Sequence, residues 1–165
     1  MDTTQPIDQF EGEFEFLSNF FKLLIPIVWG DIAFDTVENA YQASKSSNHL
    51  TRVAMSKMKP GKAKRKGAKI LASGISVNRW WNDDFKLRLM ERLVRLKFAT
   101  NPDLAEKLLA TGDRQIIEGN HWHDNFFGVC RCGNCPIDKQ VPAELQNQLG
   151  KIIMKIRDGF RTQQN

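Results

Sequence analysis

The sequence predicts a mainly α-helical protein of the α+β class: one compact helical domain with a small N-terminal β-hairpin. Two observations carry this prediction. Apolar residues recur at helical spacing in residues 85–96 and 145–156, and two short apolar runs flank a Gly-Asp pair near residue 30. With 165 residues, 41% of them hydrophobic, the chain is long enough to bury one core. We expect a single domain over residues 1–165, with residues 1–9 as candidates for disorder.

The N-terminal part is expected to be extended over residues 10–35. Within it, LLIPIVWGDIAF consists of two apolar strands around Gly30 and Asp31, a pair typical of a tight hairpin turn. A helix should follow, because Asp35 and Glu38 have the spacing of an acidic capping box.

Two further helices are predicted in the middle of the chain. The stretch WWNDDFKLRLMERLVRLKF has Asn82 or Asp83 as the cap of an amphipathic helix. In NPDLAEKLLATG, Asn101 is the expected N-cap, Pro102 the first helical residue, and Gly112 the end. The lysine-rich segment before these helices contains two glycines and a proline, which interrupt it.

The C-terminal part contains a long loop and one helix. Residues 114–139 begin with a brief strand-like QII and continue as a loop that is dense in polar, aromatic and cysteine residues, and loops of this length are typically functional or disordered. The aromatic content argues against disorder. The last helix is expected from about Pro142 to Gly159.

The positive charge is unevenly distributed. Between Asn39 and Asn82 there are ten Lys and Arg residues and no Asp or Glu, so the rest of the chain is net −5 although the whole is +5. Seven of these cations lie in KMKPGKAKRKGAK, residues 57–69. The run suits a partner that carries phosphate, on a small ligand or on a polynucleotide; the alternative is a solvated basic surface.

Several features indicate a cytoplasmic protein. No apolar run reaches the ~20 residues that cross a bilayer, and the acidic start of the chain lacks the basic and apolar regions of a secretory signal. Three cysteines within six residues do not form a disulfide framework. We therefore expect no membrane partner, and nothing in the composition favours one oligomeric state.

The cysteines have a spacing that suits a metal. Cys130, Cys132 and Cys135 form C-x-C-x-x-C, with His121 and His123 just upstream. Three thiolates and one imidazole, for which we choose His123, would complete a tetrahedral zinc site with no position left for a catalytic water. The alternatives are reduced thiols without a metal or, less favoured, a cysteine nucleophile activated by histidine.

The stretch ENAYQASK places three reactive side chains on one helical face. Glu38, Gln42 and Lys45 fall within an arc of roughly 60° and span about 10 Å of helix. A lysine attacks a masked carbonyl such as ribose C1 when burial or nearby cations lower its pKa, and a carboxylate one or two turns away can move the proton. The alternative is a wet surface stripe with a capping glutamate.

Six segments in order resemble the NADAR, or YbiA-like, family: FLSNFF, FDTVENAYQASK, MKPGKAKRKG, LMERLVRLKFATNPDLAEKLLATG, IIEGNHWHDNFFG and NQLGKIIMKIR. The resemblance implies one mainly helical domain with N-glycosidase activity on a phosphorylated ribose and no cofactor required for catalysis. Two substrate types are implied: ADP-ribose attached to guanine, including guanine in DNA, and ribosylamino-pyrimidine intermediates of riboflavin biosynthesis. We favour removal of ADP-ribose from guanine, with DNA as a candidate partner.

The resemblance also implies roles for individual residues. The E-x-x-x-Q-x-x-K element makes Glu38 the acid and base and Lys45 the nucleophile that forms an imine with opened ribose. Phe127 stands where the family commonly has tryptophan, so that this ring would stack without an N–H donor. The predicted substrate-binding residues are Asn19, Phe20, Gln42, Lys64, Trp81, Asp124, Phe127 and Gly128.

Two other functions are compatible with the same residues. One is a module that recognises ADP-ribose, or binds nucleic acid through the basic run, without catalysis. A small zinc module would bind a partner through the Cys/His loop.

Overall fold

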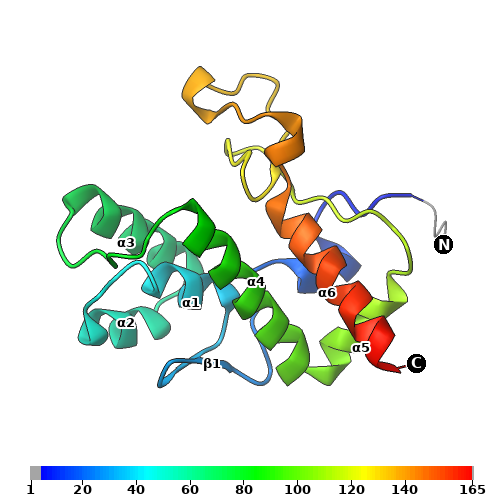
Figure 1. Cartoon of the computed structure of the whole chain (residues 1–165), viewed down its shortest axis with the longest axis horizontal. Helices are drawn as coiled ribbons and strands as arrows, with labels where there is room; N and C mark the ends of the chain where they lie inside the picture. Colours follow the sequence, from blue (N-terminus) through cyan, green and yellow to red (C-terminus); the bar gives the residue numbers. More distant parts are fainter. Residues whose placement is uncertain (1–4, 165) are drawn as a thin grey trace. The chain divides into compact units, whose positions relative to one another are not determined.

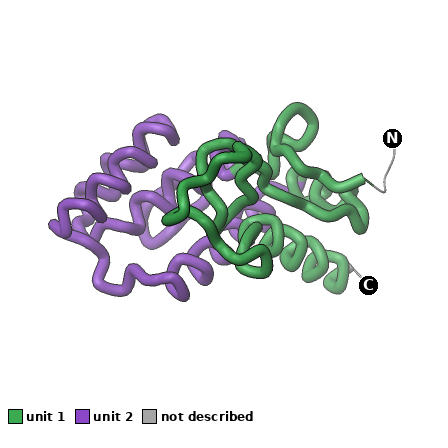
Figure 2. Tube along the Cα trace, turned by 90° about the horizontal axis from the view of Figure 1, so that it is seen from above, with its two compact units in different colours: residues 1–18, 103–165 green, residues 19–102 purple. Residues whose placement is uncertain are grey.

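The computed structural model describes residues 5–164, which form two compact units (Figure 2). Unit 1 comprises residues 1–18 and 103–165, and unit 2 comprises residues 19–102. Unit 1 is built from both ends of the chain, so unit 2 is an insertion within it. The expected single domain stays a prediction. Figure 1 gives the order of the elements along the chain.

Unit 2 begins with the predicted hairpin. Strands β1 (Ile27–Trp29) and β2 (Ile32–Phe34) pair antiparallel across the Gly30–Asp31 turn, in which Gly30 has a φ of +64°. This conformation costs glycine little because it has no Cβ. The remainder of the unit is helical: α1 (Val37–Ala43), α2 (His49–Ser56), α3 (Pro60–Ser73) and α4 (Asp83–Thr100).

Helix α1 is the centre of unit 2. All seven of its residues are buried, and it packs against α2, α3 and α4. Its N-cap is Thr36, whose hydroxyl accepts from the Asn39 N–H at 3.0 Å. The predicted cap at Asp35 is therefore wrong by one residue, because a threonine hydroxyl reaches the first turn equally well.

Helix α3 is formed by the basic segment, although its proline and glycines predict an interruption. Pro60 occupies the first helical turn, where its missing N–H is no loss, and Gly61 and Gly67 lie inside the helix. Gly74 closes it in the left-handed conformation. The short helix α2 was not predicted either.

Helix α4 confirms the main helical prediction, with the Asn82 side chain accepting from the Phe85 N–H at 2.8 Å. Asn101 behaves differently from the expectation. It is fully buried and its amide pairs with the backbone of Ile25 in both directions, at 2.9 and 3.0 Å. Asn101 ends α4, and its side chain is used to hold the loop before β1.

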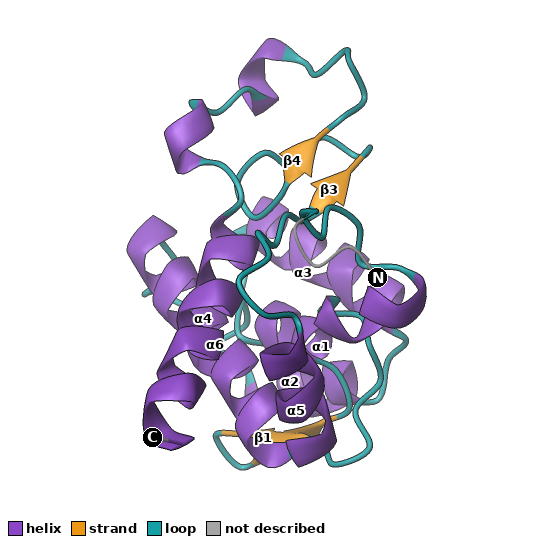
Figure 3. Cartoon of the chain, turned by 90° about the vertical axis from the view of Figure 1, so that its right-hand side faces the viewer, coloured by secondary structure: helices purple, strands orange, loops and turns teal. Residues whose placement is uncertain are grey.

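Unit 1 contains the remaining elements (Figure 3). Residues 12–17, expected to be extended, form a 3₁₀ helix, Gly12–Leu17. Ile7 is buried and forms a single bridge to Ile116, so the segment expected to be disordered is held at this point, while residues 1–4 lie outside the described residues. The other elements are α5 (Pro102–Ala110), the parallel two-residue strands β3 (Gly119–Asn120) and β4 (Val129–Cys130), two 3₁₀ turns (Ile137–Lys139 and Ala143–Leu145) and α6 (Gln148–Gln164).

Helix α6 begins and ends later than predicted. Asn147 has a φ of +57°, which a helix cannot contain, so Pro142 leads only into a 3₁₀ turn. The helix then continues past Gly159 to residue 164. The mainly helical architecture with a small hairpin is nevertheless confirmed. Within the described chain, no helix has the length and apolar character needed to span a bilayer.

Candidate active site

Glu38 and Gln42 lie buried on helix α1 in unit 2. Glu38 is 6% exposed and Gln42 is 4% exposed. The Gln42 Nε2 donates to Glu38 Oε1 at 2.8 Å, and the Glu38 backbone N–H donates to the carbonyl oxygen of Asn19 at 3.0 Å. The bond from Gln42 orients the Glu38 carboxylate. Because glutamate is rarely buried, its burial here indicates a role beyond capping the helix.

Lys45 lies in the turn just after α1, which ends at Ala43. The half-buried side chain places Nζ 5.6 Å from the ring centroid of Tyr41 and 5.5 Å from that of Trp81. Aromatic faces stabilise a cation here, but they replace the water that a surface lysine would have.

The amine of Lys45 is easier to deprotonate than an ordinary lysine. Burial lowers its pKa from 10.5 to about 8; the negative charge of Glu38 opposes this shift, and the positive charges of Lys64 and Lys86 add to it. A free amine is thus present in useful amount near neutral pH, as a lysine nucleophile requires.

Aromatic rings surround this amine. Tyr41 and Trp81 meet edge to face with centroids 5.3 Å apart, and Trp81 and Phe85 do so at 5.9 Å. The turn is held by Asn78, whose N–H donates to the Lys45 carbonyl at 2.8 Å and whose Nδ2 donates to Ser44 O at 3.0 Å. Trp81 follows Asn78 by three residues, so this anchored turn places its ring beside the Lys45 amine.

Two more predicted residues lie together at the edge of α3. The Nζ of Lys64 is 5.7 Å from the ring centroid of Phe20, which is 43% exposed. Lys64 also influences the pKa of Lys45, so it belongs to the same electrostatic environment. Asn19 is buried, and its Oδ1 has no hydrogen-bond partner while its Nδ2 contacts Met90 Sδ at 3.3 Å. A buried acceptor without a partner needs an explanation, and a bound polar ligand would supply one.

Gly67 allows α3 to approach α1 closely. A Cβ at this position would lie 2.1 Å from Gln42 Oε1 and 3.1 Å from Lys45 Cδ. Glycine lowers the stability of a helix relative to alanine, and here it permits this close contact. Gln42 Oε1, which has no hydrogen-bond partner, is directed at the glycine, so we interpret Gln42 as a residue that positions Glu38 rather than one that contacts substrate.

Gly67→Ala is expected to lower the free energy of unfolding by about 1–3 kcal/mol, because the added methyl group must displace Gln42 or separate the helices. Gly61→Ala is the matched control in the same helix, since its Cβ would meet nothing closer than 3.8 Å. That variant should be neutral or stabilised by up to ~1 kcal/mol. Urea denaturation of both proteins checks the prediction, and equal effects at the two positions would contradict it.

The other predicted substrate residues belong to unit 1 and have clear structural uses there. Asp124 Oδ1 accepts from the N–H groups of Phe126 and Phe127 at 3.1 and 3.0 Å, which closes a turn. A Cβ at Gly128 would lie 2.4 Å from Glu118 O, so this position requires glycine. The half-buried ring of Phe127 meets that of Phe126 edge to face at 5.0 Å. A substrate role for Asp124, Phe127 and Gly128 stays a prediction.

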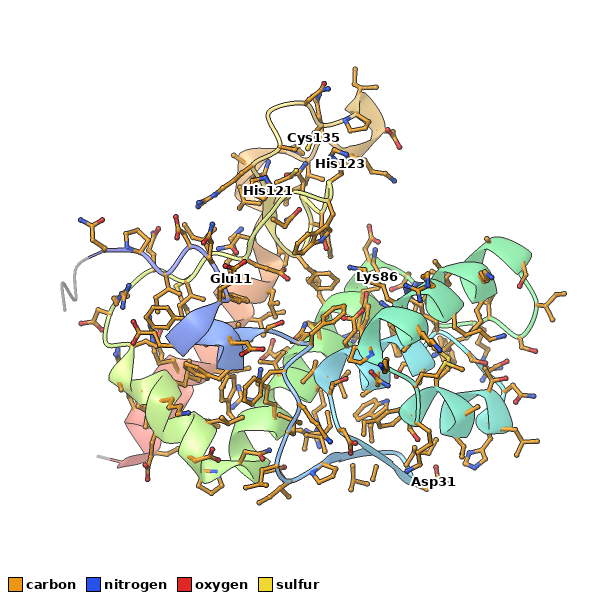
Figure 4. The ribbon with its side chains drawn as sticks, turned by 180° about the vertical axis from the view of Figure 1, so that it is seen from behind. Glu11, Asp31, Lys86, His121, His123 and Cys135 are labelled. Atoms are coloured by element: carbon orange, nitrogen blue, oxygen red, sulfur yellow. The ribbon has the colours of Figure 1, made fainter. Side chains whose placement is uncertain are left out.

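The predicted metal ligands come together in the same unit. The ligand atoms of His123, Cys130, Cys132 and Cys135 all lie within 4.8 Å of one another. His121 is not a member of this group. Figure 4 shows both histidines and Cys135 in this loop.

Several residues around the lysine carry no signal in the sequence that predicts their place in the site. Tyr41, Asn78 and Lys86 were not singled out, although Tyr41 lies within the quoted motif at one turn from Lys45. A second unusual amine, Lys97 on α4, was missed as well: it is 1% exposed, and burial lowers its pKa to about 7. Its complete burial among residues that include Phe21 and Phe98 indicates a structural amine.

Fold and site together define a mainly helical protein with a buried glutamate beside a lysine of lowered pKa, flanked by aromatic rings and cations. The chain belongs to the NADAR domain family, whose profile matches residues 8–161. The fold resembles the NMR structure of the E. coli protein YbiA, with a TM-score of 0.75 and 22% identity, over 98% of this chain and 88% of that one.

Three relatives have informative names. A protein named N-glycosidase from Nostoc punctiforme is 32% identical over 132 residues, 79% of this chain and 77% of its own. Another N-glycosidase, from Acanthamoeba polyphaga mimivirus, is 38% identical over 80 residues, 46% of this chain and 45% of that protein. A riboflavin biosynthesis protein from Vibrio vulnificus is 28% identical over 159 residues, 93% of this chain but 38% of that protein. The chain thus spans less than half of the last two relatives.

A cavity beside the hairpin lies apart from the predicted site residues. It has a volume of about 290 Å³, and its lining includes Trp29, Phe34, Ser44 and Arg52. None of the residues predicted to act on substrate lines it.

Proposed function

We propose that this protein is an N-glycosidase that cleaves the bond between a base and a phosphorylated ribose, and that its substrate is ADP-ribose attached to guanine in a nucleotide or in DNA. The observation that carries the proposal is the lowered pKa of Lys45 next to the buried carboxylate of Glu38. The N-glycosidase names of two relatives support the class of reaction.

In the proposed reaction, the neutral amine of Lys45 attacks ribose C1. A C–N bond to lysine forms while the C–N bond to the base breaks. The Glu38 carboxylate takes the proton that the lysine nitrogen loses and passes it to the departing nitrogen. Opening of the ribose ring then leaves an imine, which water hydrolyses to release the sugar and restore the amine.

The aromatic rings would hold the substrate. Trp81 and the exposed ring of Phe20 offer faces on which a purine can stack. The orphaned Oδ1 of Asn19 is an acceptor suited to a ribose hydroxyl.

The cations of α3 favour a diphosphate over a monophosphate. Lys64 lies within electrostatic reach of Lys45, so a phosphate close to the ribose has a partner there. Further exposed cations continue along the same helix and could meet a second phosphate or a DNA backbone; they are Lys62, Arg65, Lys66 and Lys69.

A second candidate substrate is a ribosylamino-pyrimidine phosphate, which would undergo the same bond cleavage. The name of the Vibrio vulnificus relative favours it, since that protein is assigned to riboflavin biosynthesis. In that case a single phosphate would suffice, and most of the α3 cations would be a solvated surface.

The function is tested by incubating the purified protein with an oligonucleotide carrying ADP-ribosylated guanine and, separately, with the pyrimidine substrate, and by following the released products by mass spectrometry. Release of ADP-ribose with restored guanine is expected. Release only from the pyrimidine substrate would transfer the assignment to the second candidate. No release from either substrate, with thermal stabilisation by ADP-ribose, would indicate a binding module and overturn the proposal.

A further inference from the structure

The loop of unit 1 that follows β3 gathers one imidazole and three thiols. His123 Nδ1 lies 3.3 Å from Cys132 Sγ, 3.6 Å from Cys135 Sγ and 3.9 Å from Cys130 Sγ, and the sulfurs of Cys132 and Cys135 are 3.4 Å apart. The thiols are free. The proposed glycosidase reaction makes no use of this cluster, which belongs to unit 1 while Glu38 and Lys45 belong to unit 2.

We propose that His123, Cys130, Cys132 and Cys135 bind one Zn²⁺ ion in a closed tetrahedral site. Ligands at the corners of such a site, with Zn–S near 2.3 Å and Zn–N near 2.0–2.1 Å, lie about 3.5–3.8 Å from one another. Four of the six separations, at 3.3–3.9 Å, bracket this range, and all six are within 4.8 Å. Four ligands of this type in this geometry select zinc over the harder magnesium and calcium ions.

The backbone of the loop is shaped to direct these atoms at a common centre. His123 has a φ of +66°, which is uncommon for a residue with a side chain, and Gly133 between two of the cysteines has a φ of +69°. A bound ion offsets the cost of holding histidine in this conformation.

Hydrogen-bond donors surround the cysteine sulfurs, as is common for thiolates that bind a metal. The side chain of the buried Asn125 donates to Cys135 Sγ at 3.3 Å and to Lys139 O at 2.9 Å, and its Oδ1 accepts from the Cys130 N–H at 2.9 Å. The Asn134 N–H donates to Cys132 Sγ at 3.4 Å. Such bonds orient the ligands and stabilise negative charge on sulfur.

The site would be structural. Because the protein supplies all four ligands, no position is left for a catalytic water. The loop is joined to the start of α6, where the N–H groups of Asn147, Gln148 and Leu149 each donate to a carbonyl oxygen in residues 126–128 at 3.0 Å. Zinc would therefore stabilise this turn and the segment that leads into α6. The fold of unit 2, which has its own core, would not depend on it.

The test is elemental analysis of the full chain expressed in zinc-supplemented medium. About one zinc per chain is expected for the wild type, and loss of most of it for Cys135→Ser and His123→Asn. His121→Asn is the matched control, because this histidine is two residues away and outside the cluster. It should retain its zinc; loss from His121→Asn with retention by His123→Asn would overturn the ligand assignment.

Two further measurements use only the wild-type chain, in case a variant does not fold. Metal-free protein is titrated with Zn²⁺ while the reaction of its thiols with a disulfide reagent is followed, and Co²⁺ is added as a spectroscopic probe. Protection of all three thiols at one equivalent, and an intense tetrahedral Co²⁺–thiolate spectrum, are expected. Thiols that react equally with and without Zn²⁺, with no bound zinc after purification, would overturn the proposal.

Discussion

Replacing Lys45 by methionine is expected to lower kcat by about 10³-fold or more while the protein stays folded, because the proposed imine forms on the Lys45 amine. Methionine keeps the apolar stem against Tyr41 and Trp81, so packing is largely retained. Lys107→Met is the control: it removes an exposed charge from α5, outside the proposed site, and should leave kcat within about threefold, since exposed charges contribute little. Turnover near the wild-type value in Lys45→Met would exclude the nucleophile role.

The same amine sets a pH dependence. Since the neutral form attacks, kcat/KM should rise about tenfold per pH unit below the pKa of about 8 and level off above it. Lys64→Met removes a charge that lowers this pKa, so the midpoint should move to higher pH, whereas Lys66→Met should leave it in place. A midpoint near 10 in the wild type would mean that the amine is not buried as the structure indicates.

Borohydride gives a direct readout of the intermediate. It reduces an imine to a stable amine, which adds the mass of the sugar moiety to the chain and stops turnover. Peptide mapping should locate this added mass at Lys45 and find none in Lys45→Met. Trapping at another lysine would reassign the nucleophile without excluding the N-glycosidase class.

Replacing Glu38 by glutamine is expected to lower kcat about 10²–10⁴-fold, the range found when a general acid is removed. Glutamine has the same shape, and its amide oxygen can still accept from Gln42, so a loss of activity would not result from repacking. Glu106→Gln, on an exposed part of α5, controls for the change in net charge. Activity of each variant is measured on the same ADP-ribosylated oligonucleotide.

Two readouts separate proton transfer from a structural effect of Glu38. A conjugate whose leaving base is already cationic needs no proton from the enzyme, so Glu38→Gln should slow it far less than it slows the guanine conjugate. The pKa of Lys45 should also fall further, because the charge of Glu38 raises it. An equal loss on both conjugates, with an unchanged pH midpoint, would contradict the role of general acid.

Local patterns were sufficient where neighbouring residues alone decide the structure. The Gly30–Asp31 turn and the Asn82 cap are settled within a few residues, and the sequence predicts both correctly. Helix α3 was missed because Pro60, Gly61 and Gly67 count as interruptions in isolation. Pro60 is harmless in the first helical turn, and Gly67 is required by packing against α1, which no local pattern reveals.

The sequence by itself indicated the helical character and the three cysteine ligands, because these depend on residue types at fixed spacing, and its six segments that resemble the NADAR family indicated the family. Only the tertiary structure decided that Lys45 lies beyond the end of α1, that Tyr41, Trp81 and Lys64 surround its amine, and that His123 and not His121 joins the cysteines. The physical reason is that a pKa and a set of interatomic distances depend on burial and on neighbours from distant segments, and spacing along the chain specifies neither.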